Sequence, residues 1–223
     1  MKKLEINIKD LKYNLDLLKK HSENTQIIAV VKANGMGFDL IKYSKFLTDN
    51  GIDFLAVATT KEAIALREEG IDTKILMLSE VYSEEELEFL VKNDIILTVG
   101  SLVQKEKIER IAKKLNKIAN AHVKIDTGFG RYGFIYLNEY DILEAVKDSE
   151  NLMISGIYTH FSKAINYNWT NIQFQRFNNL VLKAKEINEN LIAHCSNSTA
   201  FLLYPEMNLD AVRLRVMYSV DEF

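Results

Sequence analysis

Short apolar runs recur along the chain at intervals that leave room for a helix between one run and the next. The runs are IIAVVK (27–32), FLAVAT (54–59), KILMLS (74–79), IILTVG (95–100), AHVKID (121–126), ISGIYTH (154–160), LIAHCS (191–196) and DAVRLRV (210–216). Their nearly continuous apolarity is typical of strands buried on both faces of a parallel sheet, whereas half-exposed antiparallel strands alternate. The pattern therefore predicts about eight parallel strands.

The segments between these runs are amphipathic. In SEEELEFLVKN (83–93), Ser83 and Glu86 form a capping-box pattern ahead of an apolar stripe. LVQKEKIERIAKKLNKIA (102–119) repeats apolar residues at three- and four-residue spacing, and lysine and glutamate fill its other face. Strand and helix alternating about eight times predict an α/β fold of the (β/α)8 TIM-type barrel class, with an open α/β sheet as the alternative.

Length and composition narrow the class of protein. The 223 residues suffice for one sizeable core, and a barrel uses such a length as a single domain. With 28 Lys and Arg against 31 Asp and Glu, we expect no nucleic acid and no membrane as partner. No apolar run reaches the roughly 18 to 20 residues that span a bilayer. A single cysteine, and an N-terminus without a signal-peptide core, favour a cytoplasmic protein.

Polar residues near the ends of the predicted strands are the candidates for chemistry, because barrel active sites form where those ends meet the following loops. By that test the candidates are Lys32, Ser79, Lys124, Asp126, Arg131, His160, His194, Asn197, Ser198 and Arg213. Lys32 directly follows five apolar residues, and burying a free ammonium is costly. It is therefore either a reactive amine, acting as a base or forming an imine, or a structural lysine whose head reaches solvent.

The segment HVKIDTGFGRYGF (122–134) combines a lysine with three glycines. Lys124 is in phase with His122 and Asp126, so some of this set should point into the barrel, where a lysine needs an anionic partner. The alternative is an ion pair that only sets geometry. GFGRYG matches a dinucleotide-binding pattern weakly, because no helix pattern follows it. The glycines would otherwise form a tight turn or hold Arg131 near the barrel mouth.

Two histidines end successive predicted strands, His160 and His194, which raises a metal-hydrolase interpretation. The first strand carries no H-x-H pair and the other histidines lie elsewhere, so we expect no metal. Asn197 and Ser198 begin an apolar helical run, where they serve as an anion site or as ordinary helix caps. Cys195 alternates with its neighbours as a packing residue does.

Five spaced segments together resemble the motif series of the alanine racemase family. They are AVVKANGMG, HVKIDTGFGRYGF, GIYTHFS, HCSNSTA and AVR, in that order, within residues 1 to about 213. The resemblance implies a barrel domain that binds pyridoxal 5'-phosphate (PLP). In the family this barrel is normally followed by a second, mostly β domain in a head-to-tail homodimer, and that domain supplies a catalytic tyrosine across the interface.

The resemblance implies roles for three residues on the substrate side. Lys32 would hold PLP as an imine and serve as one of two bases in proton transfer. Arg131 would help orient the substrate carboxylate and the opposite base. Lys124 matches a position that is often carbamylated, a change that would turn a buried cation into an anion able to pair with Arg131.

It implies further roles on the cofactor side. His160 would orient Arg213, and Arg213 would face the pyridine nitrogen of PLP, which an arginine leaves unprotonated. His194, Asn197 and Ser198 match the segment whose serine contacts the phosphate.

The chain also departs from the family pattern. Met36 stands where the family has a tyrosine that contacts the phosphate. After Arg213 the family has a small residue and a glycine, whereas this chain reads LRVMYSVDEF, so Arg215 would either clash with the phosphate or add a charge. We expect residues 1–213 to form the PLP-binding domain and residues 214–223 an atypical tail of the last strand, with the family's C-terminal β domain absent.

The sequence thus favours a PLP-dependent isomerase, a racemase that interconverts L- and D-alanine by abstracting the Cα proton of the PLP-bound amino acid. Without the second domain we expect a truncated enzyme of low activity. Two alternatives remain, a non-catalytic PLP-binding or homeostasis protein of related barrel fold, and an inert fragment that needs a separate partner chain. The barrel residues do not fix which small amino acid is the substrate.

Overall fold

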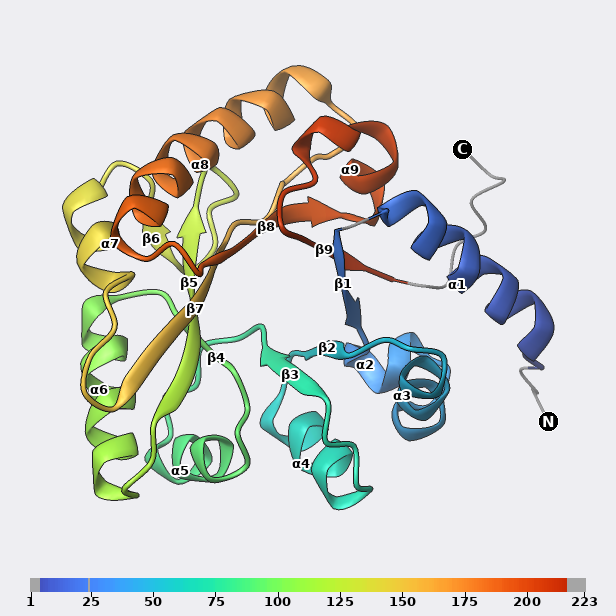
Figure 1. The fold of residues 1–223 in the computed structure, drawn as a ribbon, viewed down its shortest axis with the longest axis horizontal. Helices are drawn as coiled ribbons and strands as arrows, with labels where there is room; N and C mark the ends of the chain where they lie inside the picture. The colour runs from blue at the N-terminus through green and yellow to red at the C-terminus, as the bar shows by residue number, and fades with distance from the viewer. Residues whose placement is uncertain (1–4, 24, 216–223) are drawn as a thin grey trace.

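Eight parallel strands form a ring in the computed structural model, which describes residues 5–23 and 25–215 (Figure 1). They are β1 (Gln26–Val30), β2 (Phe54–Val57), β3 (Lys74–Met77), β4 (Leu97–Val99), β5 (Ala119–Asp126), β7 (Leu152–Tyr158), β8 (Ile192–Asn197) and β9 (Ala211–Leu214). Each lies within two residues of the apolar run that predicts it. Leu214 of the predicted tail thus belongs to β9, and residues 216–223 of that tail lie outside the described residues.

The strands pair in an order that closes into a ring. The first strand pairs with β2 and with the last strand, β9, and the order continues through β8, β7 and β5 to β4. A parallel bridge between Leu76 and Ile96 joins β3 to the residues before β4, and the Met77 N–H donates to the Ile96 carbonyl at 2.8 Å. The predicted TIM-type barrel is therefore confirmed, and the open-sheet alternative is wrong.

Helices connect the strands and lie outside the ring in Figure 1. They are α1 (Ile8–Ser22), α2 (Lys32–Met36), α3 (Leu40–Asp49), α4 (Thr60–Glu68), α5 (Glu84–Lys92), α6 (Leu102–Lys114), α7 (Glu139–Ala145), α8 (Tyr167–Ile187) and α9 (Ser198–Leu203), with a 3-10 helix at Pro205–Met207 and a short strand, β6 (Phe134–Ile135), paired to β5. Within the described part of the chain, no helix combines the length and apolarity that a bilayer crossing requires.

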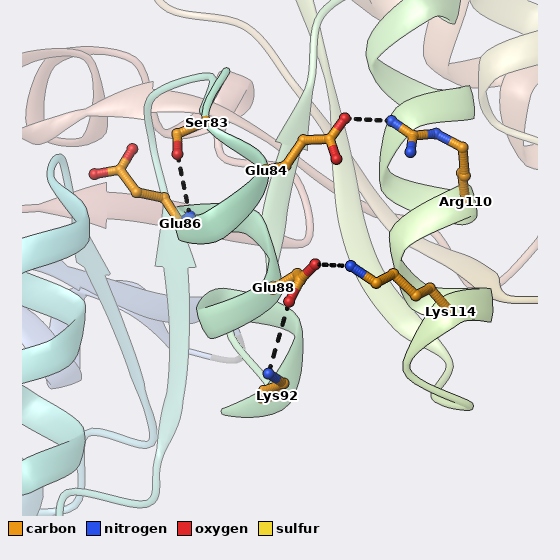
Figure 2. Close-up of polar contacts among 7 residues, drawn as sticks. All are labelled: Ser83, Glu84, Glu86, Glu88, Lys92, Arg110 and Lys114. Atoms are coloured by element: carbon orange, nitrogen blue, oxygen red, sulfur yellow. Dashed lines mark hydrogen bonds and ion pairs between the residues drawn. The ribbon is translucent and has the colours of Figure 1, made fainter.

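The two helices that the sequence predicts are present. At α5 the Glu86 N–H donates to Ser83 Oγ at 3.4 Å, as the capping pattern indicates. Figure 2 shows this cap beside exposed ion pairs that join α5 to α6, Glu84 with Arg110 and Glu88 with Lys114. Such exposed pairs contribute little to stability. The predicted 102–119 helix was too long, because α6 ends at Lys114 and β5 begins at Ala119.

The barrel interior contains an apolar cluster and buried polar side chains. The apolar part consists of Ile28, Val30, Phe54, Ala56, Leu76, Ile96 and Ala211. The Phe54 ring of β2 contacts the His122 ring of β5 at 6.0 Å between centroids, although these strands are not neighbours in the sheet. The contact therefore crosses the barrel. Gly156 of β7 leaves room for this histidine, since a Cβ there would lie 2.6 Å from the His122 ring.

Candidate active site

A cavity of about 670 Å³ opens at the carboxyl ends of the barrel strands. Its lining is Val30, Lys32, Ala58, Leu78, Ser79, Lys124, Arg131, Tyr132, Tyr158, His160, Asn197, Ser198, Thr199, Leu202, Arg213 and Arg215. The volume falls in the usual range for small-molecule sites. Of the ten residues that the strand-end rule selects, eight line this cavity, and only Asp126 and His194 lie outside its lining.

Lys32 follows β1 and begins an unusual turn. From Ala33 to Gly37 every residue has a positive φ, so the chain makes one left-handed helical turn directly after the lysine. A left-handed turn is unfavourable for residues with a Cβ, and it persists only where the surroundings hold it. The Gly35 N–H donates to the Val31 carbonyl at 2.9 Å, and the Ala33 N–H donates to Glu62 Oε1 at 2.7 Å.

The environment of Lys32 favours the neutral amine. Burial is the largest cause that lowers the pKa of Lys32, followed by the charges of Arg215 and Arg131, while Glu62 acts in the opposite direction. The side chain is half-buried and borders the cavity. An amine of lowered pKa that faces a cavity is available as a base and as a nucleophile toward a carbonyl carbon.

Lys124 lies deeper in the barrel, on β5. Its side chain is 5% exposed, and its Nζ donates to the Tyr132 carbonyl at 2.5 Å. Burial lowers the pKa of Lys124 to about 8. Among the described residues it forms no ion pair, so the interpretation of Lys124 as half of a structural ion pair is wrong. The reason is that the carboxylate nearest in sequence, Asp126, is occupied by the backbone.

Asp126 shapes the glycine-containing loop after β5. Its carboxylate accepts four backbone N–H bonds of 2.7 to 3.0 Å, from residues 128 to 131. Gly133, with φ of 129°, passes so close to β5 that a Cβ would lie 2.9 Å from the Lys124 carbonyl. The loop carries Arg131 to the cavity, where its guanidinium lies 3.8 Å above the Phe129 ring. No helix opens at these glycines, so the dinucleotide interpretation is wrong.

Arg213 is buried at the base of the cavity and donates several hydrogen bonds. Nη1 donates to Nδ1 of His194 at 2.7 Å and to its carbonyl at 3.1 Å. Nη2 donates to the carbonyls of Thr159 at 2.7 Å and Cys195 at 3.1 Å, and lies 3.3 Å from Nδ1 of His160. Among the described residues no hydrogen bond involves its Nε, so one donor remains for a ligand.

The histidines beneath Arg213 are neutral and have fixed tautomers. Burial, and then the charge of Arg213, lower the pKa of His160 to about 2 and that of His194 well below its ordinary value. Arginine only donates, so Nδ1 of His194 accepts and its proton lies on Nε2, which is 2.9 Å from Nδ1 of His122. By the same logic the proton of His122 lies on its own Nε2. His194 therefore contacts Arg213 directly, and His122 holds His194 in place.

Tyr158 is a further member of this cluster that the strand-end candidates did not include. Its ring stacks on His194 at 4.9 Å with an interplanar angle of 4°, and Arg213 lies 5.3 Å from the ring centroid. Its hydroxyl lies 2.8 Å from Thr98 Oγ1. The signal that identifies it is its phase, because Tyr158 lies two residues before His160 at the end of the same run.

Asn197 and Ser198 have different roles at the start of α9. Asn197 Oδ1 accepts from the Ala200 N–H at 3.0 Å, an ordinary helix cap. Ser198 Oγ accepts from the Arg215 N–H at 3.0 Å, which leaves the serine proton available in the cavity. The buried Cys195 donates to the Met207 carbonyl, and burial raises its pKa to about 12, in agreement with a packing role.

The cavity is strongly cationic in a chain of net charge −3. Of the residues that the structure describes, five basic ones line it, Lys32, Lys124, Arg131, Arg213 and Arg215, and none of the lining residues is an aspartate or glutamate. A site of this composition attracts anions and concentrates them near the lysine. The arrangement can therefore hold an anionic carbonyl compound against the Lys32 amine.

Comparisons with known proteins agree with this geometry. The family model described as "Alanine racemase, N-terminal domain" matches residues 6–217. The alanine racemase of Methanococcus maripaludis is 38% identical over 214 residues, which cover 94% of this chain and 57% of that protein. Alanine racemase 2 of Oceanobacillus iheyensis is 33% identical over 215 residues, which cover 95% of this chain and 55% of that protein. The chain thus spans little more than half the length of these relatives.

Solved structures show the same barrel. Clostridium difficile 630 alanine racemase in complex with cycloserine superposes with a TM-score of 0.89 at 35% identity, covering 96% of this chain and 60% of that one. Alanine racemase from Bacillus anthracis with bound L-Ala-P superposes with a TM-score of 0.83 at 26% identity, covering 94% of this chain and 55% of that one.

Proposed function

The chain belongs to the alanine racemase family, and from this premise we propose that its cavity binds PLP through Lys32 and serves the interconversion of L- and D-alanine. The observation that carries the proposal is a half-buried lysine of lowered pKa in a cavity whose lining, within the described part of the chain, includes five basic residues and no aspartate or glutamate. In this proposal residues 1–213 form the PLP-binding domain.

The residues present fit PLP. The cofactor joins an aldehyde, an aromatic ring nitrogen and a phosphate, and the cavity offers an amine, an unused arginine donor and a serine hydroxyl among several cations. When bound, PLP supplies an electron sink that acidifies the Cα proton of an amino acid. The 670 Å³ cavity has room for the cofactor together with a small amino acid.

Lys32 is proposed to move the proton on one face of the substrate. Its lowered pKa favours the neutral amine, and a neutral amine is needed both to bind an aldehyde and to accept a proton. Arg131 is proposed to orient the substrate carboxylate, because it is the arginine that the loop carries over the cavity rather than beneath it.

Arg213 is proposed to hold the ring nitrogen through its Nε–H. The contacts with the His160 and His194 rings and with three backbone carbonyls fix the guanidinium and use its other donors. An arginine does not give up its proton in proteins, so it donates a hydrogen bond to the ring without protonating it. This weakens the electron sink and restrains side reactions.

Lys124 is proposed to react with carbon dioxide to form a carbamate. A pKa of about 8 leaves about a tenth of the amine neutral at pH 7, and the neutral form is the one that reacts. The resulting anion would pair with Arg131, whose charge already acts on Lys124.

Alanine conversion tests the proposal. Purified protein is incubated with PLP and L-alanine, and D-alanine is measured by chiral chromatography, with Lys32→Ala as the control. D-alanine that depends on Lys32 supports the racemase. Binding of PLP without any D-alanine favours the non-catalytic PLP-binding alternative instead.

The family also supports a homodimer and a cytoplasmic location, which belong to the same proposal. Sedimentation equilibrium of the purified protein tests the assembly. Cell fractionation tests the location.

A further inference from the structure

Arg215 is a basic residue at the cavity that the roles above leave unused. It follows the last residue of β9, and its backbone N–H donates to Ser198 Oγ at 3.0 Å. This bond fixes the start of its side chain beside the serine that borders the cavity. Arg215 lines the same cavity as Lys32, and its charge acts on the lysine more strongly than that of Arg131 does.

Three other basic side chains of the cavity already have contacts among the described residues. Arg213 donates to His194 and to backbone carbonyls, and Lys124 donates to the Tyr132 carbonyl. Arg131 stacks on Phe129. Among the described residues the Arg215 side chain has no hydrogen bond and no ion pair. Its guanidinium N–H groups are therefore available to bind a ligand near Ser198.

We propose, on the basis of the proposed function, that the Arg215 guanidinium and the Ser198 hydroxyl together bind the phosphate group of PLP. A guanidinium presents paired N–H donors that match two phosphate oxygens, and such charge-assisted bonds are about twice as strong as neutral ones. The serine accepts from the Arg215 backbone and keeps its own proton to donate. The sequence leaves open whether Arg215 clashes with the phosphate or adds a charge beside it. In this proposal Arg215 is a phosphate ligand.

The test compares PLP with pyridoxal, which carries the same aldehyde and ring but no phosphate. Dissociation constants for both are measured by absorbance titration and equilibrium dialysis, for the natural chain and for Arg215→Gln. Both compounds react with the same Lys32 amine, so their ratio cancels any change in its reactivity. We expect Arg215→Gln to reduce the preference for PLP over pyridoxal by roughly tenfold or more.

Two variants sharpen this test. Arg215→Lys keeps the charge but not the fork, so its preference for PLP should be intermediate. Arg131→Gln removes an equal charge from another wall of the cavity, and a smaller effect is expected because no direct contact is lost. A preference that is the same in Arg215→Gln as in the natural chain overturns the inference.

Failure of the proposed function gives a different result. If the natural chain binds neither aldehyde, the PLP proposal fails, and the site is then probed with inorganic phosphate against chloride at equal ionic strength. A phosphate-dependent rise in unfolding temperature that Arg215→Gln loses supports the anion site alone. An equal rise in both proteins, or no rise, overturns the inference as well.

Discussion

At the scale of the residue, the reactivity of Lys32 depends on the charges around it. Burial and two arginines lower its pKa, and Arg215 has the larger effect of the two. Among the described residues Lys32 forms no ion pair, and its side chain is half-buried. Its neutral, reactive form is therefore reached at a lower pH than in an ordinary lysine.

Removal of the Arg215 charge should make Lys32 react only at higher pH. In Arg215→Gln the ammonium loses a repulsive neighbour, so the pKa of Lys32 rises toward its ordinary value. The measurement is the rate of adduct formation with pyridoxal from pH 6 to 10. Arg131→Gln should shift the profile in the same direction by less, and coincident profiles for all three proteins would contradict this assignment.

His122 should make stability depend on pH. Burial lowers its pKa to about 3, and in the unfolded chain it titrates near its ordinary value of 6.5. Its stabilising contribution is complete above 6.5 and is lost as the pH falls toward 3, because the unfolded chain then binds the extra proton. In His122→Gln the slope of unfolding free energy against pH should fall by about 1.4 kcal/mol per pH unit in that window.

Urea unfolding at several pH values between 4 and 7 measures this slope. The exposed His21 provides the matched substitution, and the slope of His122→Gln is compared with that of His21→Gln. An unchanged slope in His122→Gln would show that the histidine is protonated in the folded protein.

At the scale of the element, Glu62 joins the start of α4 to the turn after Lys32. Its carboxylate accepts from the N–H groups of Ala58 and Thr59 at 2.9 and 3.1 Å and from that of Ala33 at 2.7 Å. Thr59 and Glu62 complete the capping box of α4. One side chain therefore caps a helix and holds the left-handed turn that carries the reactive lysine.

Glu62→Ala should destabilise the protein by about 1 to 2 kcal/mol, since it leaves three backbone donors without this acceptor. The free energy of unfolding in urea measures the loss. Glu86→Ala is the control, because Glu86 has the same position in the first turn of α5 and is exposed. Equal losses in the two variants would contradict the role given to Glu62.

The sequence predicts the repeating elements and not the local exceptions. Apolar runs identify all eight barrel strands because burial on both faces leaves a strong pattern. The left-handed turn at 33–37 has no such pattern, since Ala33 and Asn34 adopt it through contacts with distant residues such as Glu62. The end of α6 was misjudged because apolar spacing continues past the residue where the helix stops.

The sequence likewise predicts one part of the candidate site and misses another. Residues at the strand ends predict much of the cavity lining, because the barrel brings these ends together independently of the loop conformations. The support beneath Arg213 depends on pairs far apart in the chain, such as His122 with His194, 72 residues away. No local spacing encodes such a contact. The predicted ion pair of Lys124 is wrong for a similar reason, because the Asp126 carboxylate binds backbone N–H groups of the following loop instead.

At the scale of the whole molecule, the barrel interior is filled from opposite sides. His122 packs against Phe54 across the ring and against His194 on its own side, so its ring has no space to withdraw. Gly156 on the neighbouring strand has no side chain, and this leaves the space that the His122 ring occupies.

Gly156→Ala should destabilise the barrel by about 1 to 3 kcal/mol, because the new Cβ would overlap the His122 ring. Thermal and urea unfolding measure the effect. Met153→Ala, on the same strand but 44% exposed, should change stability little. Adding His122→Ala to Gly156→Ala should recover part of the loss, and strictly additive losses would argue against the overlap.

The central claim is that the Lys32 amine binds the aldehyde of PLP within the cationic cavity, and a covalent map tests it most directly. The protein is mixed with PLP, reduced with borohydride, digested and analysed by mass spectrometry, alongside Lys32→Ala and a Lys124→Met control. The account predicts one dominant adduct, on Lys32, that persists in Lys124→Met and disappears in Lys32→Ala. Label spread over exposed lysines with none on Lys32, or an adduct that survives Lys32→Ala unchanged, would contradict it.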